Sequence, residues 1–126
     1  MKLRKRVKLM KGYDVYKRVI NLLGYVNQDD AITSDNALYR RALHVMNQVL
    51  VDLKQEEVED LNCNINLSRV TIDALVYGMA MLLSLIGCDA ELNRIFTQIY
   101  NSKRAAVLNE ITIVTDVLPT VIEGES

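Results

Sequence analysis

The chain has 126 residues, the usual size of one domain, and its formal net charge of −1 gives no global signal for nucleic-acid binding. Half of the residues are hydrophobic and a quarter are charged, which provides for a core and a solvated surface. With no Trp, one Phe, one Pro and five Gly, the composition is unlike that of a turn-rich β-sandwich. It favours a soluble all-α domain in which aliphatic side chains pack helix against helix.

The first predicted helix spans residues 14–23, and its start can extend back to Met10. Gly24 follows and suits the left-handed conformation that often ends a helix. Residues 25–34 contain many turn-forming residues and are predicted to be a loop. The apolar residues of this helix recur at helical spacing: Val15, Val19, Ile20, Leu22 and Leu23.

The second predicted helix spans residues 35–54, with Thr33, Ser34 and Asp35 as alternative N-caps. Its apolar residues recur at steps of three and four: Leu38, Ala42, Val45, Met46, Val49, Leu50 and Leu53. The polar residues on the opposite side are expected to face water: Arg40, Arg41, Asn47 and Asp52. The polar stretch after this helix is typical of a connection, and residues 62–67 are predicted to be a loop or a short extended piece.

The third predicted helix is capped by Ser68 or Thr71 and runs to about Ile86. Its second half is apolar on every face, which predicts the central helix of a bundle. The nearly apolar run of residues 74–88 is shorter than the roughly 20 residues that span a bilayer, so no membrane helix is expected. Gly78 costs about 1 kcal/mol relative to Ala, a cost that is tolerable where a neighbouring helix approaches closely.

A fourth helix is predicted from Ala90, after a turn in which Gly87 ends one helix and Asp89 starts the next. One side carries Leu92, Ile95, Phe96, Ile99 and Val107, and the other carries Arg94, Gln98, Lys103 and Arg104. The helix is expected to fray near Glu110. Residues 111–126 are rich in β-branched residues and contain Pro119, so they are predicted to be an extended tail that pairs with another chain or lies along the surface.

Charge is distributed unevenly along the chain. Residues 1–18 contain eight Lys or Arg and one acid, whereas the remainder has seven basic and fifteen acidic residues. The basic end is either a solvated, frayed terminus or a contact for an acidic surface on another copy. The chain thus divides into a basic N-terminal arm (1–12), a helical domain (13–110) and an extended C-terminal tail (111–126). The candidate protein-contact residues lie in the two arms: Lys2, Arg4, Lys5, Arg6 and Lys8, and Ile111, Ile113, Val114, Val117 and Leu118.

No residue pattern indicates catalysis. His44 is the only histidine, it borders the apolar stripe of its helix, and no Ser or Cys stands at a recognisable spacing from it. Cys63 and Cys88 have neither metal-ligand nor redox spacing, which is typical of a reduced cytosolic protein. The loop that contains Asp29, Asp30 and Asp35 lacks the alternating ligands and central Gly of a calcium site. The sequence therefore predicts a non-enzyme without cofactor or metal.

DNA recognition is also disfavoured. The turn at residues 87–89 joins two helices, but the second helix is long and begins with Asp89 and Glu91, which phosphate groups would repel. The sequence does not exclude a non-specific contact between the basic N-terminus and DNA.

Residues 72–112 resemble the C-terminal helix pair of small head–tail connector (adaptor) proteins of tailed bacteriophages and prophages. In that family an Ala/Leu-rich helix ends at a Gly-x-Asp-like turn. An amphipathic helix with an aromatic-x-x-x-Tyr pattern and a Lys/Arg-Ala-Ala end then follows. The matching elements here are Gly87–Asp89, Phe96, Tyr100 and Lys103–Ala106. The amphipathic helix of residues 35–54 also fits the family plan, whereas both arms depart from it.

The resemblance implies a subunit that forms a ring beneath the portal of a capsid and connects it to the tail or to a stopper protein. Such a protein resides in the virion, or in the bacterial cytoplasm when a prophage encodes it. The alternative is a helical regulatory or scaffolding module that binds a single protein partner through an apolar groove. Both interpretations predict a protein that works by binding other proteins.

Overall fold

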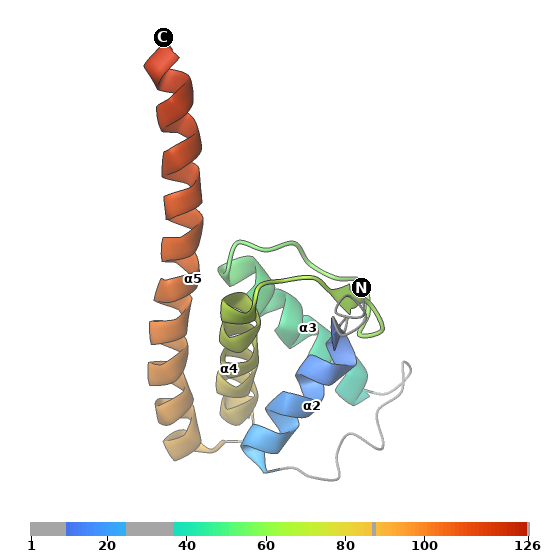
Figure 1. Ribbon diagram of the computed structural model, residues 1–126. Helices are drawn as coiled ribbons and strands as arrows, with labels where there is room; N and C mark the ends of the chain where they lie inside the picture. Colours follow the sequence, from blue (N-terminus) through green and yellow to red (C-terminus); the bar gives the residue numbers. More distant parts are fainter. Residues whose placement is uncertain (1–9, 25–36, 87, 126) are drawn as a thin grey trace, which may run out of the picture.

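The computed structural model describes residues 10–24, 37–86 and 88–125, with Leu38 and residues 112–125 described by their backbone alone. The fold is all-α, as the sequence predicts, and Figure 1 shows four helices with a short two-stranded sheet in the described part of the chain. The elements are β1 (Met10–Lys11), α2 (Gly12–Leu23), α3 (Ala37–Asp52), β2 (Asn64–Ile65), α4 (Arg69–Ile86) and α5 (Ala90–Glu125).

The start of α2 is fixed by backbone pairing with the segment before α4. β1 pairs with β2 in antiparallel register, with Met10 opposite Ile65. The N–H of Gly12 donates to the carbonyl of Cys63 at 3.2 Å, and a Cβ at Gly12 would lie 2.9 Å from the carbonyl oxygen of Leu61. A residue with a side chain cannot approach so closely, so Gly12 allows this contact. The sequence predicts a loop or a short extended piece at residues 62–67, and the structure shows the extended piece as β2, paired with a strand that the sequence does not predict.

The helix ends follow the chemistry expected from the sequence. Gly24 ends α2 with φ of 83°, in the left-handed region. Ser68 caps α4 by accepting a 3.2 Å hydrogen bond from the N–H of Thr71, and Asp89 caps α5 by accepting one of 3.1 Å from the N–H of Leu92. The alternative caps predicted for α3, Thr33, Ser34 and Asp35, lie outside the described residues, as does Gly87.

The apolar stripe predicted for α3 is confirmed. Its described members from Ala42 to Leu53 are each at most 2% exposed. Asn47, which was expected to face water, is instead half-buried. Its side-chain amide donates to the carbonyl of Val58 at 3.0 Å and accepts from the Val58 N–H at 2.8 Å. This pair of bonds holds the connection after α3 against the helix, because both polar groups of the Val58 backbone are satisfied there.

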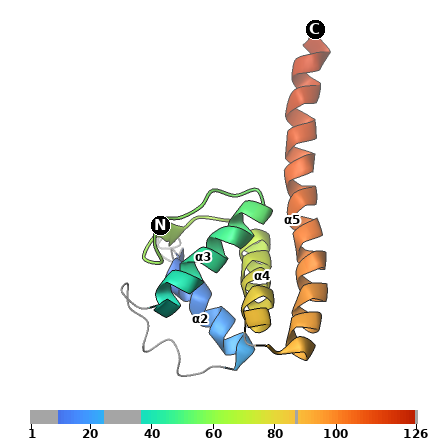
Figure 2. The same cartoon turned by 180° about the vertical axis from the view of Figure 1, so that it is seen from behind.

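The central helix is α4, as predicted, because α2, α3 and α5 all pack against it. Among the described helices it alone has the length and apolar composition of a membrane span. The core helix of a helical bundle has the same properties, and α4 occupies that place in this fold. Figure 2 shows α2 and α3 lying on the side of α4 away from α5.

Gly78 explains how closely these helices approach one another. A Cβ at this position would lie 2.6 Å from Cγ1 of Val49 on α3 and 2.8 Å from Cε1 of Tyr100 on α5. The missing side chain therefore admits neighbours from both flanking helices. The close approach expected from a glycine inside a helix is confirmed.

The extended tail predicted for residues 111–126 is corrected. α5 does not fray near Glu110 but continues through Pro119 to Glu125, for 36 residues in all. β-branched residues are weak helix formers rather than helix breakers, and each added residue other than proline contributes a hydrogen bond to an established helix. Pro119 has no N–H and removes one such bond, but the helix continues through it. At about 1.5 Å per residue, α5 is about 54 Å long and α4, with 18 residues, is about 27 Å. The second half of α5 consequently extends beyond the bundle (Figure 1).

Candidate interaction surfaces

The residues predicted to contact other proteins divide into two groups. Lys2, Arg4, Lys5, Arg6 and Lys8 lie outside the described residues. Ile111 lies in α5, where it is half-buried and packs against the hydrophobic core. Ile113, Val114, Val117 and Leu118 belong to the part of α5 that is described by its backbone alone. The tail thus presents its apolar residues on a helix rather than on an extended strand.

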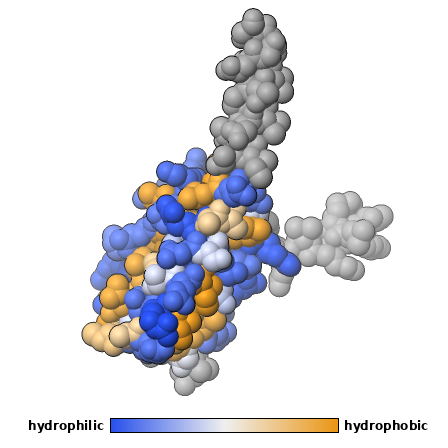
Figure 3. All heavy atoms as spheres, turned by 90° about the vertical axis from the view of Figure 1, so that its left-hand side faces the viewer, coloured by the Kyte–Doolittle hydropathy of each residue, from blue (hydrophilic) through white to orange (hydrophobic). Residues whose placement is uncertain are grey.

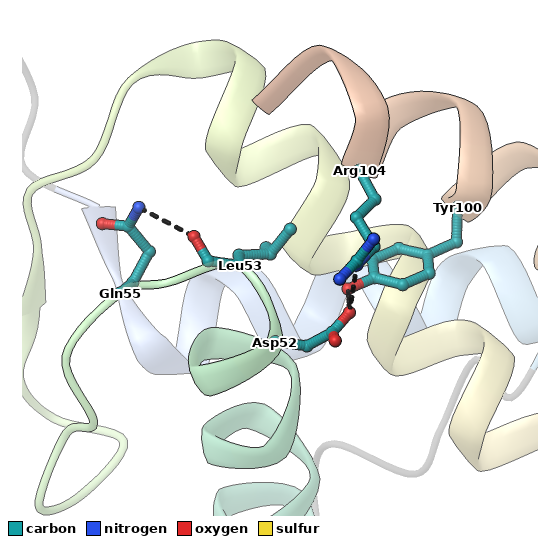
Figure 4. Close-up of polar contacts among 5 residues, drawn as sticks. All are labelled: Asp52, Leu53, Gln55, Tyr100 and Arg104. Atoms are coloured by element: carbon teal, nitrogen blue, oxygen red, sulfur yellow. Dashed lines mark hydrogen bonds and ion pairs between the residues drawn. The ribbon is translucent and has the colours of Figure 1, made fainter. Parts of the chain in front are cut away.

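A polar cluster joins α3 to α5 (Figure 4). The Tyr100 hydroxyl donates to Oδ2 of Asp52 at 2.5 Å, and Nε of Arg104 donates to the same oxygen at 2.7 Å. Asp52 and Arg104 form an ion pair whose side chains are 45% and 38% exposed, whereas Tyr100 is buried. From the sequence, Asp52 is expected to face water and Arg104 to lie opposite the apolar side of its helix, and no pattern pairs the two residues. Residues about 50 positions apart offer no local spacing by which to predict such a contact.

The cluster perturbs the protonation of its members. Burial raises the pKa of the Asp52 carboxyl, but the hydrogen bonds from Tyr100 and Arg104 outweigh it, so the pKa is lowered overall. Burial, followed by the hydrogen bond to Asp52, raises the pKa of the Tyr100 phenol. The Tyr100 phenol therefore stays protonated and the Asp52 carboxyl stays ionised at neutral pH. The two hydrogen bonds join α3 to α5 as a clasp, and a phenol that stays protonated is poorly suited to act as a nucleophile or base.

A groove runs between α2 and α4. It consists of two adjoining cavities of about 330 and 430 Å³, which share Arg18 of α2 and Asp73 of α4 as lining residues. We call these the α2–α4 groove. The remaining lining residues are largely apolar. Toward one end they are Leu22, Val76 and Tyr77, with Asn21. Toward the other end they are Met10, Leu67 and Ile72, with Arg69.

The electrostatic balance of the α2–α4 groove is positive. Arg18 and Arg69 line it, against the single acid Asp73. The ammonium of Lys103 lies over the ring of Tyr77, 5.3 Å from its centroid, and brings a third positive charge close to the same wall. The cavity beside Val76 exposes mainly apolar surface and the cavity beside Arg69 mainly polar surface, and such a groove with basic edges is suited to an amphipathic segment that carries acidic residues.

A second apolar surface lies where α4 ends. Leu85 is 59% exposed and Ile86 is 48% exposed, although both belong to the most apolar helix of the fold. On the first turns of α5, Ile95 is 37% exposed. Figure 3, which looks at the α5 side of the molecule, shows hydrophobic patches separated by hydrophilic side chains. We call Leu85 and Ile86 the α4-end patch.

The residues considered for catalysis do not form a cluster in the described part of the chain. His44 is exposed on α3, at the surface position expected for it. Cys63 is half-buried and Cys88 is exposed, and both are free thiols. Among the side chains described in residues 10–24, 37–86 and 88–111, no group of three His, Cys, Asp or Glu is placed to hold a metal ion. The loop acids Asp29, Asp30 and Asp35 lie outside these ranges.

The fold and its surfaces define a small helical bundle with a long protruding helix, an apolar groove and no described catalytic constellation. No protein-family model, no curated protein and no solved structure matches this chain.

Proposed function

We propose that this protein is a structural subunit of a phage head–tail connector, which assembles as a ring under the portal and links the capsid to the tail. The observation that carries the proposal is the length of α5, which is twice that of the helix it packs against. A helical segment that extends beyond its own bundle gains stability when a protein partner covers it. The resemblance of residues 72–112 to connector proteins supports the choice of partner.

In this proposal the protein is not an enzyme, and its partners are further copies of itself, the portal, and a tail or stopper protein. A ring requires two different faces that complement each other around a closed rotation. In the proposal, the bundle with its α2–α4 groove and the second half of α5 would supply these two different faces.

The proposal predicts that a portal protein is encoded near this gene, and that portal protein is the partner used in the test. We expect the purified chain to bind assembled portal rings and to appear as an added ring on one end of the portal by electron microscopy. Free portal with no added density at any concentration of the chain would contradict the proposal. Sedimentation of the chain alone across a concentration series, at low and moderate salt, reports whether the ring forms without the portal.

A helical module that binds one partner is the second candidate, and the α4-end patch is the observation that favours it. Leu85 and Ile86 together offer an apolar contact that a single partner helix would cover. This candidate predicts a stable monomer that forms a 1:1 complex. Substitution of Leu85 by Asp would abolish that complex, whereas the connector proposal expects portal binding to survive it.

A further inference from the structure

The α2–α4 groove has the chemistry of a docking site for an acidic amphipathic helix. Val76 is 5% exposed at its floor, Leu22 is 37% exposed at its rim, and Arg18 and Arg69 supply positive charge at its edges. A helix seated there would cover the apolar floor and place carboxylates beside the two guanidinium groups.

Residues 112–125 have the matching composition. This segment, which we call the α5 extension, contains three acidic residues, Asp116, Glu123 and Glu125, and no Lys or Arg. Its apolar residues recur in the sequence at helical steps: Val114, Val117, Leu118, Val121 and Ile122. Its backbone is helical throughout.

The α5 extension cannot reach the groove of its own chain without breaking its helix. α4 and α5 are joined by the short turn before Ala90 and run antiparallel, so α5 passes the start of α4 at about its midpoint. Beyond that point the helix leads away from the bundle, as Figures 1 and 2 both show. The groove faces α2, on another side of α4.

From these observations we infer that the α5 extension of one copy docks into the α2–α4 groove of a second copy. This inference rests on the proposed assembly into a ring and names the contact that would form it. Such a contact joins two different surfaces, so each copy keeps one free groove and one free extension, and repetition gives a closed ring or an open filament.

Charge favours this arrangement over the two nearest alternatives. Pairing of two α5 extensions with each other would bring acidic residues together without a basic partner. Occupation of the groove by the N-terminal arm would bring five Lys or Arg within residues 1–8 beside Arg18 and Arg69. Docking of the acidic extension in the basic groove avoids both repulsions.

The test uses three full-length double variants. The groove variant carries Arg18→Glu and Leu22→Asp, and the extension variant carries Val114→Asp and Leu118→Asp. The control variant carries Lys17→Glu and Val51→Asp, which likewise replace one basic and one aliphatic residue, at exposed positions that do not line the groove. Far-ultraviolet circular dichroism and thermal unfolding verify that each variant is folded, and sedimentation velocity measures assembly over a concentration series.

We expect the wild type and the control variant to assemble. Each of the other two variants alone should need at least a tenfold higher protein concentration to assemble. An equimolar mixture of the groove and extension variants retains one intact groove and one intact extension, so it should give a 1:1 heterodimer and nothing larger. Assembly by the groove variant, with loss only in the extension variant, would overturn the inference in favour of pairing between extensions.

A wild-type chain that stays monomeric at every concentration would overturn self-docking. The proposed function would survive that result if portal rings still bind the chain. Assembly through the groove without portal binding would instead remove the proposed function and leave the docking contact in place.

Discussion

The hydroxyl of Tyr100 donates a 2.5 Å hydrogen bond to Oδ2 of Asp52, and this contact joins the first half of α5 to the last residue of α3. Arg104, one turn further along α5, binds the same oxygen. Tyr100 and Arg104 therefore connect α5 to α3, although α5 packs mainly against α4. Because the second half of α5 extends beyond the bundle, contacts made by its first half determine how firmly the whole helix is held.

Removing the Tyr100 hydroxyl tests this clasp. Tyr100→Phe keeps the ring in the core and leaves Asp52 bonded to Arg104, so we expect a loss of about 1 kcal/mol in the free energy of unfolding. Urea denaturation measures it. Tyr77→Phe is the control, because it retains the ring contacts with Phe96 and Lys103 and should change stability by less than about 0.5 kcal/mol. Equal losses in both variants would show that the Asp52 bond contributes nothing specific.

Acid stability should depend on Asp52. Its pKa is lowered in the folded protein, so the unfolded chain takes up the proton first as the pH falls. The stabilisation by Asp52 is complete above an unfolded-state pKa of about 4 and is lost as the pH falls through the lower folded-state value. Because the side chain is nearly half exposed, we expect less than about 1 kcal/mol.

Asp52→Asn should therefore flatten the dependence of unfolding free energy on pH between about 5 and 2. Urea denaturation at several pH values in this window measures the slope. The double variant Tyr100→Phe/Arg104→Gln retains the carboxylate but removes its donors and leaves burial to raise its pKa, so it should flatten the slope at least as much. An unchanged slope in Asp52→Asn would mean that other carboxylates account for the acid response.

The helices of the bundle were predictable because their signals are local. The stripe of α3, the capping residues Ser68 and Asp89, and the αL position of Gly24 each depend on neighbours within a few positions. The apolar character of α4 also predicted its central place. These features follow from side-chain periodicity and backbone hydrogen bonding alone.

The contacts between distant segments were not predictable in this way. Asp52 and Tyr100 are polar or amphipathic residues on separate helices, and only the packing of both against α4 brings them together. The same holds for Asn47, whose amide finds its partners 11 positions away in an irregular connection. In α5, the β-branched residues and Pro119 suggested an extended tail, but local propensity was overridden by continuation of an established helix.

A methyl group at position 78 should destabilise the fold. Gly78→Ala gains about 1 kcal/mol of helix propensity but forces a contact with Val49 and Tyr100, which costs about 1–3 kcal/mol. We expect net destabilisation of about 1 kcal/mol, measured by thermal or urea unfolding. Val49→Ala removes the nearer clashing atom. The loss of unfolding free energy in Val49→Ala/Gly78→Ala should therefore be smaller than the sum of the two single losses, by about 0.5 kcal/mol or more. Strict additivity would show that the clash is relieved elsewhere.

Asn47 should hold the connection between α3 and α4 in place. Asn47→Ala leaves the N–H and the carbonyl of Val58 without their partner in a partly buried position, so we expect a loss of about 2 kcal/mol in unfolding free energy. Hydrogen exchange supplies the specific readout, because the Val58 amide should lose its protection while amides within α4 keep theirs. Gln48→Ala, at the exposed neighbouring position, is the matched control and should change stability by less than about 0.5 kcal/mol. If Val58 exchanges at the same rate in Asn47→Ala as in the wild type, the connection is held by its contacts with β2 and the core rather than by this side chain.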